Sequence, residues 1–194
     1  DSDLSKLELF TLLDRLKIKY NFNQNSKEFV VLDIENFNSN QFIHYCGGIV
    51  KIAEKIDLKL YVYEGTQRNI NYGISILGDP GEDFVDKCIS ILKSKYREDK
   101  LKASIKTPKF GLFAPLEIKT KSLEDFIILN KEIYKTVSMS EPYLYKERDE
   151  DRPEKNFVVQ TSIRLAKILV NISKAKENIL DPFCGYGTIL QEAM

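Results

Sequence analysis

The sequence predicts an α+β protein with more than one domain. Segments of helical and of strand-like periodicity alternate along the chain, a polar stretch interrupts them from residue 138, and a glycine-containing loop precedes a new helix near the C-terminus. The chain has 194 residues, of which 43% are hydrophobic and 30% are charged. It can therefore bury a core as one domain of ordinary size or as two small ones.

The first sixty residues predict the order helix, strand, helix, strand. Leucines at helical spacing and a capping-box pair, Ser5 and Glu8, favour a first helix. Asn38 or Ser39 is a suitable cap for the second helix, which reaches Tyr45. The expected ranges are 4–19 for the first helix, 29–34 for the first strand and 49–56 for the second.

The central part of the chain predicts a mixed sheet with helices over one face. Residues 78–81 (Gly-Asp-Pro-Gly) form a strong break, and 82–96 reads as a helix with acids first and lysines last. The expected strands are residues 58–63, 70–77, 103–106, 115–119, 126–129 and 133–137.

Residues 138–156 are polar and charged and contain two prolines, so they predict a linker. Thr161 or Ser162 then caps a helix with apolar residues on one face. Residues 178–181 predict a short buried strand that runs into a glycine loop and a helix from about Thr188.

The loop Asp181-Pro-Phe-Cys-Gly-Tyr-Gly-Thr188 is the segment with the clearest chemical content. Gly185 and Gly187 allow the backbone to approach a ligand where a Cβ would collide, and the N–H groups of the following helix favour an anion. An ordinary strand–turn–helix with glycines for the turn is the alternative. Cys184 is interpreted as a small residue lining the loop, with a nucleophilic role as the alternative.

This string resembles motif I of amino-group methyltransferases, which bind S-adenosylmethionine; Tyr186 stands where those motifs usually have Ser or Thr. The segment from Phe157 to Ala166 is similar to the turn and helix that flank the methionine end of the cofactor. The resemblance implies cofactor-binding roles for Asp181, Pro182, Phe183, Cys184, Gly185, Gly187, Thr188, Gln160 and Thr161.

Three further strings are similar to the THUMP-domain tRNA guanosine-10 N2-methyltransferase family. They begin at Gly47 (GGIVKIA), at Tyr72 (YGISILG) and at Tyr145 (YxxRDxxRP). The family implies an N-terminal ferredoxin-like domain (1–60), a THUMP RNA-binding domain (61–138), a linker (139–156) and the start of a Rossmann-like methyltransferase domain (157–194). It also implies tRNA as the partner.

A local basic cluster agrees with an RNA partner. The chain has no net charge, but residues 93–109 hold seven cations and only two acids, a local charge of +5. A solvated helix end followed by a loop is the alternative interpretation. The cations are Lys93, Lys95, Arg97, Lys100, Lys102, Lys106 and Lys109.

Catalytic groups are not expected within this chain. The acidic residue that usually holds the ribose and the family's Pro-Pro-Tyr motif do not occur by Met194, so we expect a missing catalytic half or a partner chain to be needed for activity. A DNA amino-methyltransferase and a non-catalytic THUMP-type module of a split enzyme are the alternatives, and the reading frame beyond Met194 discriminates between them.

Cysteine usage and hydropathy predict a cytoplasmic protein without metal or membrane. The three cysteines show no CxxC spacing, and the one histidine, His44, is expected to be half-buried or on the surface. No apolar run approaches the roughly 20 residues that a membrane span needs.

Overall fold

The computed structural model describes residues 2–151 and 161–194, and the chain divides into two compact units. One unit comprises residues 51–139, and the other combines residues up to 50 with those from 140 onward. The N-terminal segment therefore packs with the C-terminal segment. The predicted ranges 1–60, 61–138, 139–156 and 157–194 divide the chain at other positions, and the domain identities attached to them stay predictions.

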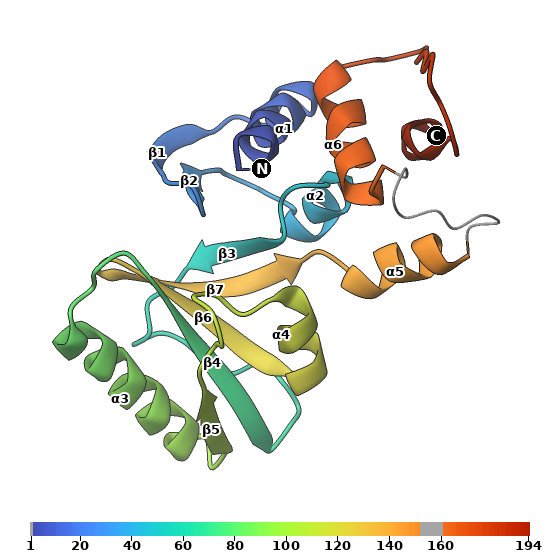
Figure 1. Cartoon of the computed structure of the whole chain (residues 1–194). Coiled ribbons are helices and arrows are strands. Elements are labelled where there is room, and N and C mark those ends of the chain that lie inside the picture. Colours follow the sequence, from blue (N-terminus) through green and yellow to red (C-terminus); the bar gives the residue numbers. More distant parts are fainter. Residues whose placement is uncertain (1, 152–160) are drawn as a thin grey trace. The chain divides into compact units, whose positions relative to one another are not determined.

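The central unit is a five-stranded mixed sheet with two helices (Figure 1). The strand order is β3-β7-β6-β4-β5, with β4 parallel to β5 and β6, and β7 antiparallel to β6 and β3. The α+β class is thus confirmed. Its elements are β3 (Lys51–Lys55), β4 (Asn69–Leu77), α3 (Glu82–Glu98), β5 (Lys102–Lys106), α4 (Pro115–Lys121), β6 (Leu123–Leu129) and β7 (Glu132–Met139).

The two helices of this unit lie on opposite faces of the sheet, so the prediction of helices over one face was wrong (Figure 1). On β6, Phe126 and Ile128 pack with α3, whereas Leu123 packs with Ile118 of α4. Leu123 is an odd number of residues away from both Phe126 and Ile128. Because successive side chains of a strand point to opposite faces, Leu123 lies on the face opposite the other two.

Helix α4 replaces a predicted strand at 115–119. Pro115 stands in the first turn, where its missing N–H costs nothing, and the Glu117 carboxylate accepts a hydrogen bond from the Ala114 backbone N–H at 3.3 Å. Glu117 also pairs with Lys121 at i,i+4, at 3.2 Å. These helix-start signals outweigh the β-like composition of the segment.

Residues 58–63 are not a strand, contrary to the prediction. Leu58 and Tyr61 are buried in the core with α3, whereas Leu60 and Val62 are exposed. Asp57 starts a turn, since its side chain accepts from the Lys59 N–H and its carbonyl from the Leu60 N–H. The turn buries residues three apart, and a strand would have buried alternate residues.

The second unit is mainly helical, with a separate two-stranded hairpin. Asn38 caps α2 by accepting from the Gln41 N–H, and Ser162 caps α6 by accepting from the Leu165 N–H, as predicted. Strand β1 was not predicted. The elements are α1 (Ser2–Arg15), β1 (Asn21–Asn25), β2 (Val30–Asp33), α2 (Ser39–Tyr45), α5 (Pro142–Glu150), α6 (Ile163–Ser173) and α7 (Thr188–Ala193).

The predicted capping box at Ser5 and Glu8 is not formed, because α1 already begins at Ser2. Glu8 lies inside the helix and is fully buried, with its carboxylate accepting hydrogen bonds from the backbone N–H groups of Gly47 (2.7 Å) and Gly48 (2.8 Å). Arg164 of α6 donates to the carbonyl oxygens of the same two glycines. The Gly-Gly string is thus a junction between α1 and α6.

Candidate functional site

The loop Asp181–Thr188 is held by local hydrogen bonds. The Asp181 carboxylate accepts from the Phe183 N–H at 3.1 Å, and the Cys184 carbonyl accepts from the Gly187 N–H at 2.7 Å. Gly185 and Gly187 have φ of +49° and +74°, where a side chain is strained. The positive φ accounts for glycine at these two positions, whereas the predicted close approach of a ligand stays a prediction.

The backbone of this loop is open. A Cβ added at Gly187 would meet nothing within 4 Å, and one at Gly185 would meet only the Phe183 carbonyl, at 3.9 Å. Phe183 is 92% exposed, and Pro182 and Cys184 are exposed too. A ligand can therefore reach the main chain here. Thr188 is the buried member of the set and begins α7.

The strand predicted before this loop is not formed. Residues 178–181 have no strand conformation, and Leu180 is 89% exposed. A strand requires a neighbour for its backbone hydrogen bonds, and both sheets of the described ranges are built from other segments. The loop thus follows an irregular segment.

Helix α7 is fixed to two other helices of its unit. It packs along α6, and Arg148 of α5 forms an ion pair with Glu192 of α7, whose side chain is only 4% exposed. Tyr145, one turn before Arg148, donates its hydroxyl to the Cys46 carbonyl at 3.3 Å. The stretch predicted as a linker therefore contains α5, whose Tyr145 and Arg148 contact other segments of the same unit.

A second charged group lies beside this contact. The Lys167 ammonium donates to the His44 carbonyl and stands 5.9 Å from the centre of the Tyr145 ring. Burial lowers the pKa of Lys167, and nearby Glu192 opposes that shift. His44 itself is exposed.

Two predicted cofactor residues lie outside the loop. Gln160 falls outside the described residues. Thr161 is partly buried and stands next to Ser162, the N-cap of α6.

The seven cations predicted to bind RNA do not share one face. Lys93, Lys95 and Arg97 are on α3, whereas Lys102 and Lys106 are on β5. Side chains of a strand alternate between its two faces, so Ser104 shares a face with Lys102 and Lys106. The Ser104 hydroxyl donates to the side chain of Asn71, the residue opposite it on β4, at 2.7 Å. Ile105 is on the other face of β5, opposite Tyr72 of β4, and Tyr72 packs against α3. The two β5 lysines therefore point away from α3.

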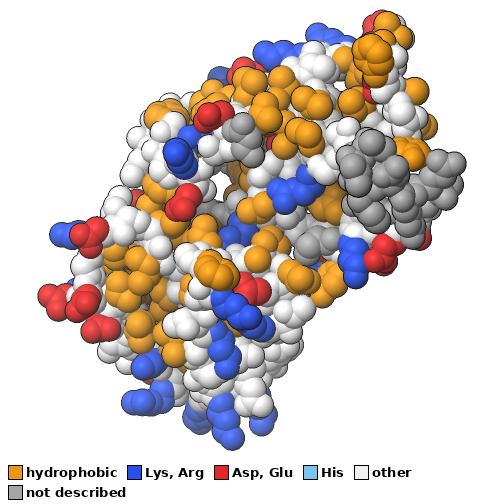
Figure 2. Space-filling model, viewed as in Figure 1, with side chains coloured by type: hydrophobic (Ala, Val, Ile, Leu, Met, Phe, Trp, Pro, Cys, Tyr) orange, Lys and Arg blue, Asp and Glu red, His pale blue; other side chains and the backbone are white. Residues whose placement is uncertain are grey.

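Lys100 stands in the turn between these groups, with φ of +57°, and Lys109 lies in the loop after β5. Two cations of α4, Lys119 and Lys121, lie on the face to which the β5 lysines point; the predicted basic cluster ends at Lys109 and does not include them. Figure 2 shows Lys and Arg side chains gathered where α3 ends and β5 begins and continuing towards α4.

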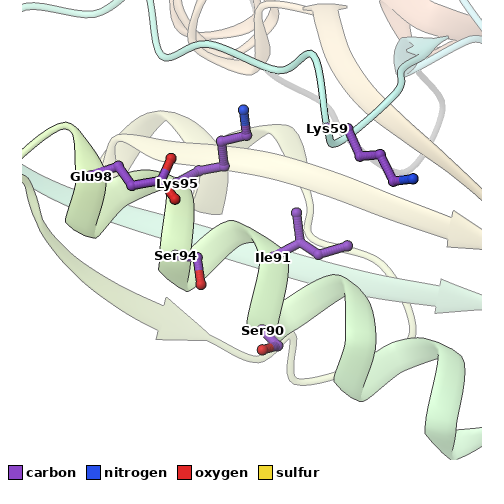
Figure 3. A pocket seen from close by; sticks show the side chains of 6 residues that line it. All are labelled: Lys59, Ser90, Ile91, Ser94, Lys95 and Glu98. Carbon is purple, nitrogen blue, oxygen red and sulfur yellow. The ribbon is translucent and has the colours of Figure 1, made fainter.

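Lys95 also lines an open cavity of about 340 Å³ between α3 and the turn that carries Lys59 (Figure 3). Its lining is mixed in charge, with Lys59 and Lys95 beside Glu98. Because an acid accompanies the cations, this cavity is less suited to a phosphate than the β5 side is. The remaining lining residues are Ser90, Ile91 and Ser94.

Two other kinds of site were sought in residues 2–151 and 161–194. No group of three or more His, Cys, Asp or Glu side chains there is arranged to hold a metal ion. Within the same ranges, no helix has the length and apolar character required to cross a membrane. In comparisons with known proteins, neither a protein-family model nor a curated protein matches the sequence.

Proposed function

We propose that this chain is the tRNA-binding portion of an S-adenosylmethionine-dependent tRNA (guanine-N2) methyltransferase, which transfers a methyl group to an exocyclic amine. The observation that carries the proposal is the open loop Asp181–Thr188, in which Gly185 and Gly187 have positive φ and leave the backbone accessible. Its residues read as methyltransferase motif I. We also expect a cytoplasmic location, since tRNA is the substrate.

The loop fits one wall of such a cofactor site. When bound, S-adenosylmethionine supplies an electrophilic methyl group on a sulfonium centre. Gly185 would offer a backbone N–H group, Gly187 would leave room for the ligand to approach the main chain, and Asp181 would offer a carboxylate close to the turn. Helix α7 has only six residues, so the glycine backbone, and not a helix dipole, is the proposed contact for the ligand. The other predicted contacts are Pro182, Phe183, Cys184, Thr188, Gln160 and Thr161.

Exposed cations without ion-pair partners support the RNA part of the proposal. Six of the seven predicted cations are exposed, and none of the seven forms a salt bridge among the described residues. Such side chains release counterions when they contact phosphates, which makes binding salt-dependent.

The test is equilibrium binding of the 194-residue chain to tRNA across a salt series. We expect weak binding that falls steeply from low to moderate salt. The double variant Lys100→Glu with Lys102→Glu reverses two charges and should flatten the dependence of log affinity on log salt. The matched control reverses two exposed lysines of the other unit, Lys19→Glu and Lys27→Glu, and should leave the slope close to that of the parent.

The outcomes separate the alternatives. Absence of tRNA binding at low salt contradicts the RNA part of the proposal. Tighter binding of duplex DNA than of tRNA favours the DNA methyltransferase. If a form that carries a complete catalytic domain binds tRNA but transfers no methyl group to it, the non-catalytic module is favoured.

A further inference from the structure

A polar and basic surface lies at the sheet edge formed by β5, and its residues come from three separate segments of the sequence. We call it the β5–α4 surface; it consists of Asn71, Lys102, Ser104, Lys106, Lys119 and Lys121. Asn71 joins its three elements, because its side chain accepts from the Ser104 hydroxyl at 2.7 Å and donates to the Lys121 carbonyl at 3.1 Å. Every residue of β5 is exposed, and β5 is the last strand of the sheet order.

The acids near this surface are already neutralised. Glu117 pairs with Lys121 at 3.2 Å, and Asp125, on the same sheet face, is buried and pairs with Lys51 at 2.9 Å. Lys102 and Lys106 form no ion pair with any described residue. The net field over the β5–α4 surface is therefore positive, and it suits a chain of phosphates.

An exposed aromatic ring stands at the end of this surface. Phe110 lies in the loop between β5 and α4 and is 87% exposed, next to Lys109. The same loop is anchored by Phe113, which packs directly on Gly73 of β4 and is only 1% exposed. One phenylalanine fixes the loop to the sheet, and the other has no packing role in the fold.

The α3 side lacks these features. Glu98 and Asp99 follow its cations directly, and Glu98 lines the same cavity as Lys95. No residue of α3 is among the exposed large hydrophobic side chains. An α3 surface could attract phosphates, but it offers no ring to a base.

We infer that the β5–α4 surface, and not the α3 surface, binds the backbone of a single-stranded RNA segment, and that Phe110 stacks on an unpaired base of that segment. Every base has a π-face that can stack on a phenyl ring, while in a duplex the bases are already stacked on one another. The inference rests on the proposed function and specifies which surface of the chain contacts RNA and how.

A matched pair of double variants tests the surface. Lys102→Gln with Lys106→Gln removes two cations from β5, and Lys93→Gln with Arg97→Gln removes two exposed cations from α3. Using a single-stranded RNA oligonucleotide, we expect the β5 pair to reduce the slope of log affinity against log salt by about 1.4, since each lost phosphate contact is worth about 0.7. The α3 pair should change it by much less.

A second measurement tests the ring. Phe110→Ala should weaken binding of the single-stranded RNA by about tenfold and leave binding of a blunt RNA duplex unchanged, whereas Phe110→Tyr should retain the affinity. A 2-aminopurine base in the oligonucleotide should lose fluorescence on the parent and on the Tyr variant, but not on the Ala variant. Leu60→Ala, which truncates another exposed apolar side chain (78%) of this unit, is the control.

Different outcomes contradict the proposed function and the binding surface. If the parent chain binds neither tRNA nor the oligonucleotide, the proposed function fails. If the parent binds RNA but the α3 pair changes the slope, or Phe110→Ala weakens single strand and duplex alike, only the present inference is overturned. In that case the lysines of β5 would serve only to prevent pairing of an edge strand with other chains.

Discussion

The carboxylate of Glu8 accepts a hydrogen bond from the side-chain amide of Asn171 at 2.7 Å, although 163 positions separate the two residues. Both side chains are buried, and Glu8 also receives the backbone N–H groups of Gly47 and Gly48. A buried carboxylate with three donors is stable only while all three remain in place. Glu8 therefore couples α1 to α6, the helix that precedes the glycine loop.

Replacing this carboxylate should loosen the second unit. Glu8→Ala leaves the backbone N–H groups of Gly47 and Gly48 without an acceptor, while the Asn171 amide keeps only the Tyr45 carbonyl, and we expect a loss of about 3 kcal/mol in the free energy of unfolding. Hydrogen exchange should show faster amide exchange in α1 and α6. Glu28→Ala, at an exposed position, is the control. Unchanged exchange in both helices would show that Glu8 does not couple them.

The contact between Gly73 and Phe113 predicts a second stability effect. A Cβ at Gly73 would lie 2.3 Å from Phe113 Cε2, so the ring must move. Gly73→Ala should cost about 1–3 kcal/mol in denaturant unfolding because of overpacking. Adding Phe113→Leu should recover part of that loss, and strictly additive single and double variants would contradict the steric explanation.

The cysteines should differ in reactivity. Burial raises the pKa of the Cys46 thiol, with a further increase from Glu8, and burial raises the pKa of Cys88 as well. Cys184 is exposed in the glycine loop. At neutral pH iodoacetamide should therefore modify one thiol quickly and two only after unfolding. Cys184→Ser should abolish the fast reaction, and rapid modification of Cys46 in the native chain would contradict the burial.

Two glycines allow backbone strain to be separated from cofactor binding. Gly187 (φ +74°, ψ +19°) and Gly81 (φ +78°, ψ +144°) both have positive φ but differ in ψ, and an added Cβ meets nothing within 4 Å at either position. Changing either to Val should cost stability, on the order of 1–2 kcal/mol at Gly187 and more at Gly81, whose backbone lies close to a region that only glycine adopts. Only Gly187→Val should weaken calorimetric binding of S-adenosylmethionine by a form with a complete catalytic domain. Equal affinities of the two variants would show that the loop is a structural turn.

Local signals in the sequence predicted many individual elements. The caps Asn38 and Ser162, helix α3 and strands β3 to β7 follow from side chains within a few residues of one another. The glycine loop was predicted as a turn that lets a ligand approach the backbone, and the structure adds that Gly185 and Gly187 have positive φ. The errors at 58–63 and 178–181 arose where an apolar run was assigned to a strand without a partner strand to support it.

The sequence by itself determined the α+β class, most of the helices and strands, and the open glycine turn, because periodicity, caps and φ preferences act over a few residues. Tertiary structure alone decided that Glu8 lies among three donors from two distant segments, and that the basic run 93–109 is divided between two faces of a sheet edge. The face to which a lysine points depends on strand register and on which helix covers the sheet. Both are set by contacts between segments far apart in the chain.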